Sequence, residues 1–101
     1  MSDPIDDITI EWTDDEGRAT VKELKKEILT KGAWATVMFM YQELNKANGE
    51  YGSAKFRIGR YQKRNGIYYP HSKFNISSQA QAQKIIGILE SWMVDSPADD
   101  K

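Results

Sequence analysis

Alternating hydrophobic and polar positions predict a β-sheet in the middle of the chain. Residues 33–44 are largely apolar on both sides of the alternation, which is typical of a central strand or of one covered by a partner subunit. In residues 55–64, Phe56 and Ile58 point one way and basic residues the other, so we expect one core face and one basic face. Residues 8–12 alternate briefly and predict a short strand. The side chains of residues 33–44 that we expect in the core or a dimer interface include Trp34, Met38 and Met40.

A hairpin is predicted directly after the basic strand. The dipeptide Asn65-Gly66 is preferred in two-residue type I′ turns, so residues 67–76 should run back antiparallel to residues 55–64. Pro70 lacks the N–H group that a central sheet ladder needs. Its presence therefore favours an edge strand or a bulge at that point of the return strand.

Two capping-box patterns predict helices on either side of the sheet. Thr20, with Glu23 three positions later, precedes apolar residues at helical spacing, and this predicts a helix over 21–31. Ser78 begins a second such pattern, which predicts an amphipathic helix over 79–93. The apolar stripe of this second helix consists of Ala82, Ile85, Ile86, Leu89, Trp92 and Met93.

These elements predict an α+β fold: a curved antiparallel β-sheet of three to four strands with an N-terminal helix and a C-terminal amphipathic helix. A chain of 101 residues suits a single domain, with flexible tails at 1–7 and 95–101 and a binding core at 33–93. Cysteine is absent, the first residues are acidic rather than a secretory leader, and no apolar run is long enough for a membrane helix. We therefore expect a cytoplasmic protein that does not enter a membrane.

Charge is strongly polarised along the chain, although the formal net charge is only -1. Residues 1–20 contain seven acidic side chains and one basic side chain, whereas residues 55–73 contain six basic side chains and no acidic one. A run of basic residues on a strand with aromatic residues among them is the charge footprint of a nucleic-acid-binding surface. The acidic start of the chain suggests the further hypothesis that it competes with nucleic acid for the basic segment.

The candidate binding surface is a strip of basic and aromatic side chains along one strand. Same-face residues of a strand lie about 7 Å apart, so its cations can follow a phosphate chain. Tyr61 offers a ring on which a base can stack, and Gly59 leaves the centre of the strip flat. Arg60 and Arg64 alternate onto the opposite face and reach the strip only through a bulge or the turn. The candidate nucleic-acid-binding residues are Lys55, Arg57, Gly59, Arg60, Tyr61, Lys63, Arg64 and Lys73.

Two segments carry a resemblance to a known family: KFRIGRY at 55–61, and SKFNIS at 72–77, which leads directly into the helix of 79–93. With the strand before them, they resemble the single-stranded-DNA-binding domain of the positive-cofactor-four family of transcriptional coactivators. The resemblance implies a homodimer with the helices at the subunit interface, and curved sheets that present basic and aromatic residues to unpaired DNA. The positions that match the family pattern are Tyr61, Lys73 and Ile76. The sequence departs from it at Gly59 and Arg60, where the family pattern includes an acidic residue.

Two other interpretations remain open. The order helix, three strands, helix is also that of a double-stranded-RNA-binding domain, although residues 77–83 at the start of the last helix are uncharged. The basic strip could instead dock an acidic protein, such as a subunit of the transcription or replication machinery. We expect no enzyme, metal or cofactor site, because His71 is the single histidine and the chain has no cysteine or glycine-rich phosphate loop.

Overall fold

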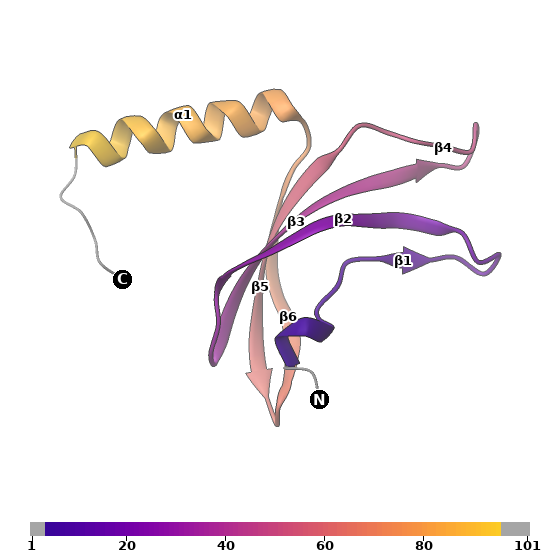
Figure 1. The fold of residues 1–101 in the computed structure, drawn as a ribbon, viewed down its shortest axis with the longest axis horizontal. Helices are drawn as coiled ribbons and strands as arrows, with labels where there is room; N and C mark the ends of the chain where they lie inside the picture. Colours follow the sequence, from indigo (N-terminus) through magenta and orange to yellow (C-terminus); the bar gives the residue numbers. More distant parts are fainter. Residues whose placement is uncertain (1–3, 96–101) are drawn as a thin grey trace.

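A curled antiparallel sheet with one helix projecting from its end dominates the computed structural model, which describes residues 4–95 (Figure 1). The sheet has six strands in the order β1-β2-β3-β5-β6, with β4 paired to β3 alone. The α+β class and the curved antiparallel sheet are confirmed, but the sheet has more strands than predicted. The elements are η1 (Pro4–Asp7), β1 (Trp12–Thr13), β2 (Ala19–Thr30), β3 (Trp34–Asn45), β4 (Glu50–Tyr51), β5 (Lys55–Arg64), β6 (Ile67–Ile76) and α1 (Gln79–Asp95).

The predicted helix over 21–31 is wrong, because this segment belongs to strand β2. Two register shifts interrupt the pairing of β2 with β3, one beside Leu24 and one beside Leu29. Each irregularity breaks the two-residue alternation, so the apolar positions fall at a spacing that resembles a helical one. The residues of the apparent capping box hold the N-terminal segment instead: the Glu23 carboxylate accepts hydrogen bonds from the Thr9 hydroxyl, at 2.7 Å, and from the Ile10 N–H.

The hairpin and the last helix are confirmed. Asn65 and Gly66 have φ angles of 52° and 79°, as a type I′ turn requires, and they join β5 to β6. β6 is an edge strand, and its register with β5 shifts next to Pro70, as expected. The Ser78 hydroxyl caps α1 by accepting the Gln81 N–H at 3.1 Å.

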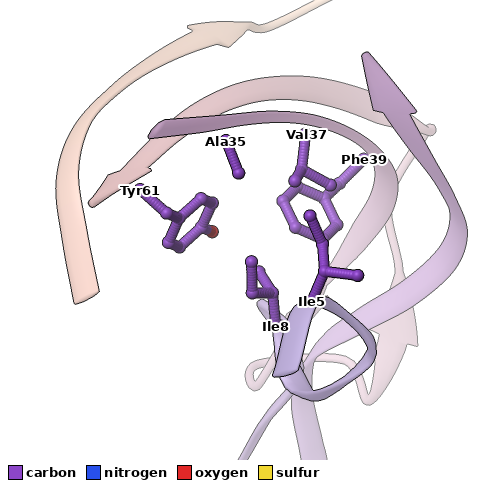
Figure 2. Packing of buried hydrophobic residues seen from close by; sticks show 6 residues of the cluster. All are labelled: Ile5, Ile8, Ala35, Val37, Phe39 and Tyr61. Carbon is purple, nitrogen blue, oxygen red and sulfur yellow. The ribbon is translucent and has the colours of Figure 1, made fainter. Parts of the chain in front are cut away.

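The buried core lies on the face of the sheet that was predicted to be the open basic face. We call this the inner face; it carries Val37 and Tyr61, and the opposite, outer face carries Met38 and Ile58. Ile5 and Ile8 of the N-terminal segment point at the inner face and cover it (Figure 2). The Phe56 and Ile58 side, predicted to be the core, is only half-buried in the single chain. The buried cluster consists of Ile5, Ile8, Ala35, Val37, Phe39 and Tyr61.

The N-terminal segment is part of the fold and not a tail from residue 4 onwards. Residues 4–7, predicted to be flexible, form η1, and Ile5 is only 1% exposed. The ammonium group of Lys26 donates hydrogen bonds to the carbonyl oxygens of Ile5, at 2.9 Å, and Ile8, at 2.7 Å. Residue 95, also predicted to be tail, is the last residue of α1, and the rest of the predicted tails, 1–3 and 96–101, lies outside the described residues.

The single chain is more open than a closed domain of its size. Its radius of gyration is 16.1 Å, against about 13 Å for a compact domain of 100 residues. The accessible surface of 7725 Å² is also about a third larger than the value of about 5,800 Å² for a folded monomer of this mass. Most of the apolar stripe of α1 is exposed, and β6 is the main element that the helix contacts. Between residues 4 and 95, no helix is long and apolar enough to cross a bilayer.

Candidate nucleic-acid interface

The structure distributes the candidate residues over both faces of the β5–β6 hairpin. Those on the inner face alternate along β5, and a residue of β6 joins them opposite Gly59. Arg60 and Arg64 lie on the outer face, as strand alternation predicts, and the register shift beside Arg60 does not bring them to the inner side. The inner-face candidates are Lys55, Arg57, Gly59, Tyr61, Lys63 and Lys73.

Tyr61 is a core residue, so its ring is not open to a base while residues 4–8 cover it. The side chain is 8% exposed and packs in the same cluster as Ile5 and Ile8. Burial raises the pKa of the Tyr61 hydroxyl, and the positive charge of Arg57 lowers this pKa by a smaller amount. A Cβ at Gly59 would lie 3.0 Å from Cε1 of Tyr61. Gly59 therefore makes room for the Tyr61 ring, rather than for the ligand that the sequence suggested.

Lys55 differs from the other candidate cations because a carboxylate already neutralises it. Its ammonium group lies 2.6 Å from Oε1 of Glu43 on the neighbouring strand. The hydrogen bond from this ammonium group to the Glu43 carboxylate raises the pKa of Lys55. Lys55 is therefore the least suited of the inner-face cations to bind a phosphate.

The other five candidate cations have no carboxylate partner among residues 4–95. Four of them lie over aromatic rings instead, at 4.8 to 5.8 Å from the ring centroid. Arg57 lies over Tyr41 and also donates from Nε to the Asn75 side-chain oxygen at 2.7 Å. Elsewhere in the chain, Arg18 and Lys46 form ion pairs with acidic side chains. The unpaired cations of the hairpin are Arg57, Arg60, Lys63, Arg64 and Lys73.

A cleft of about 440 Å³ separates the N-terminal segment from the inner side of β5 and β6. One wall includes Arg57, Tyr61, His71 and Lys73, and residues 9–12 line the other. Trp12 at this wall is 67% exposed. The sequence pattern placed Trp12 only on the apolar side of a short strand, and no local signal indicated that it would face two cations across a cleft. The cleft joins a large aromatic ring to two positive charges, and the Glu11 carboxylate, which accepts a hydrogen bond from the Glu23 N–H, also lines it.

The outer face holds a second group of aromatic and basic side chains near the hairpin. Arg60 lies 4.8 Å from the centroid of the Trp34 ring, and His71 meets the same ring edge-on at 4.8 Å. Arg64 lies over Tyr69 at 5.6 Å. Trp34, predicted to lie in the core or an interface, is 37% exposed in the single chain.

The acidic start of the chain makes no ion pair with the five unpaired cations within the described residues; what holds the segment on the inner face is apolar packing and the Lys26 bonds. Nor do residues 4–95 hold three or more His, Asp or Glu side chains placed to share a metal ion.

Comparisons with protein-family models, with curated proteins and with solved structures found no match for this chain.

Proposed function

We propose that this chain is a single-stranded nucleic-acid-binding protein that acts as a homodimer and carries out no chemistry itself. The observation that carries the proposal is the set of five hairpin cations without a carboxylate partner, defined above. Surface cations usually lie among acids, and a group that lacks them leaves a positive field for an anion. A phosphate backbone supplies anions in a row at the spacing of a strand.

Unpaired strands fit the cleft better than a duplex does. The cleft is open and of a size that admits a single base, with the exposed ring of Trp12 on one wall. Arg57 and Lys73 on the other wall are placed to meet the phosphates beside that base. Bases in a duplex are stacked on each other and cannot enter such a cleft, whereas bases of a single strand stack readily on aromatic side chains.

The homodimer accounts for the apolar surface that the single chain leaves open. The exposed stripe of α1 includes Ile86, Leu89 and Trp92, and the outer face of the sheet beside it is apolar at Met38 and Phe56. An apolar patch of this extent marks an interaction surface. In a two-fold symmetric dimer, both copies use the same patch. The α1 stripe and the apolar outer face of one copy are therefore covered by the same two surfaces of the other copy.

Gly87 supports packing of α1 against another backbone. Glycine inside a helix costs about 1 kcal/mol relative to alanine, so its presence calls for a close approach. Apart from the two neighbouring residues and the nearby backbone of α1 itself, no described atom lies within 4 Å of a Cβ built at Gly87. A second copy of α1 supplies the missing neighbour.

The element order favours a single-stranded nucleic-acid-binding protein over a double-stranded-RNA-binding domain. A double-stranded-RNA-binding domain begins with a helix ahead of its sheet, and this chain has strand β2 in that place. The elements on which the likeness to the positive-cofactor-four family rests are all present: the strand β3, the basic hairpin of β5 and β6, and the capped helix α1.

The test is fluorescence-anisotropy binding of labelled single-stranded DNA, single-stranded RNA, duplex DNA, duplex RNA and a poly-glutamate peptide at low salt. We expect the single strands to bind most tightly. In Arg57→Gln/Lys73→Gln, their affinity should fall about tenfold. The matched control is Lys22→Gln/Lys46→Gln, which removes two exposed charges far from the hairpin and should change affinity less than twofold. Tighter binding of duplex RNA or of the acidic peptide would overturn the proposal.

Sedimentation velocity tests the dimer separately. We expect the wild-type chain to sediment as a dimer and Leu89→Asp, in the middle of the exposed stripe, to sediment as a monomer. The control is Lys22→Asp on β2, because a control such as Ser91→Asp adds charge to the same helix. A wild-type monomer at the concentrations used for binding would contradict the dimer.

A further inference from the structure

The outer face near the hairpin carries a group of exposed aromatic and basic side chains that the cleft does not use. We call it the hairpin platform; its members are Trp34, Arg60, Arg64 and Tyr69. All four are exposed, and Trp34 and Tyr69 are exposed by 37% and 45%. Neither the core nor the N-terminal segment covers them.

Sheet register places the two aromatic rings in one row. Trp34 pairs with Gln62 on β5, and Gln62 pairs with Tyr69 on β6, so the rings lie on the same face two strands apart. Adjacent strands are about 4.8 Å apart, which puts the backbones of Trp34 and Tyr69 about 10 Å apart. Arg60 and Arg64 stand on either side of Gln62 along β5, each over one ring.

We propose that the hairpin platform is a second binding surface, on which unpaired nucleobases stack against Trp34, Tyr69 and the guanidinium planes of Arg60 and Arg64. This inference rests on the proposed nucleic-acid function and adds a second contact to it. A base and a guanidinium are both flat and stack on the same aromatic faces, so the pairs already present define where bases lie. The arginines supply charge for the phosphates that connect those bases.

The platform and the proposed dimer interface occupy different halves of the outer face. The outer side chains of β5 change from apolar at Phe56 and Ile58 to polar at Arg60, Gln62 and Arg64. The apolar half lies toward α1, which leaves the sheet at the end of β6 away from the hairpin turn (Figure 1). A second copy on the apolar half therefore leaves the platform open.

The two binding surfaces lie on opposite faces of the same two-stranded hairpin. Arg57, Lys63 and Lys73 face inward, and Arg60 and Arg64 face outward from the same strands. β6 is an edge strand, so a single strand can pass around it from the cleft to the platform. We expect the bound strand to contact both faces.

Tryptophan fluorescence tests contact with the platform directly. In the variant Trp12→Phe/Trp92→Phe, Trp34 is the remaining tryptophan, and stacking of a base should quench its emission as oligothymidylate is added. In Arg60→Gln/Arg64→Gln, which changes two exposed positions, the affinity for the same oligonucleotide measured by anisotropy should fall about tenfold. The slope of log affinity against log salt should become smaller by about 1.4. The matched control is again Lys22→Gln/Lys46→Gln.

The outcomes separate the platform from the proposed function. If wild-type protein and Trp12→Phe/Trp92→Phe both bind the oligonucleotide in anisotropy while Trp34 emission stays constant and Arg60→Gln/Arg64→Gln binds like the control, the platform is refuted and the nucleic-acid function stands. If the wild-type protein binds no oligonucleotide, both fail. Quenching of Trp34 with weaker binding by the arginine variant supports the platform.

Discussion

The isoleucine side chain at position 5 should contribute to stability as a core residue, although it lies five residues from the N-terminus. It is 1% exposed and packs between η1 and the inner face, in contact with the cluster that includes Val37, Phe39 and Tyr61. Ile5→Ala removes three buried carbon atoms and leaves a cavity in this cluster. Large-to-small core changes of this kind cost about 2–5 kcal/mol. A loss of about 3 kcal/mol would lower the melting temperature of a domain of this size by about 12–24 °C.

Urea unfolding followed by circular dichroism measures this loss. All variants are compared at one protein concentration, because dimerisation makes apparent stability depend on concentration. Asp6→Ala is the control, since Asp6 is exposed in the same turn of η1 and should change stability by less than about 0.5 kcal/mol. If Ile5→Ala matches this control, the N-terminal segment does not pack on the inner face, and that face is the open basic strip that the sequence predicted.

Three further variants test the inner face and the first turn. Burial raises the pKa of Tyr61 above its unfolded value of 10.0, so above about pH 10 the unfolded chain loses this proton first and stability falls by up to about 1.4 kcal/mol per pH unit. Tyr61→Phe should lose less stability over that range in urea unfolding, and parallel pH profiles would contradict the argument. Gly59→Ala places a Cβ against the buried Tyr61 ring and should destabilise the fold by about 1–3 kcal/mol, whereas an unchanged unfolding midpoint would show that the ring moves freely. The hydrogen bond from the Arg18 N–H, with a second from the Glu16 N–H, lowers the pKa of Asp14, so its charge stabilises the fold above the unfolded value of 3.8 and this stability is lost as pH falls through the lower folded value. Asp14→Asn should therefore be less stable than wild type at neutral pH and approach it in acid, and a constant difference would refute this.

Local signals in the sequence were sufficient for the second half of the chain. The alternation in β5, the Asn65-Gly66 turn and the cap at Ser78 each depend on residues that are neighbours in sequence. For that reason the hairpin and α1 were predicted at almost the observed bounds. Alternation alone also predicted that Arg60 and Arg64 lie on the face opposite to Arg57 and Lys63.

The first half of the chain required information that is not local. β2 was predicted as a helix because two bulges shift its apolar residues out of the two-residue period, and bulges are set by pairing with β3. The buried face was assigned wrongly because Ile5 and Ile8 cover the sheet from more than 25 residues away in sequence. The aromatic side chain at the cleft, Trp12, was missed for the same reason.

The salt dependence of binding tests the central claim, that the unpaired hairpin cations bind the phosphates of a single strand. Each phosphate contact to a single strand contributes about 0.7 to the slope of log affinity against log salt, so five cations predict a slope of about -3.5. In Arg57→Gln/Lys73→Gln the slope should fall to about -2.1. A wild-type slope near zero, or an unchanged slope in this variant, would contradict the account.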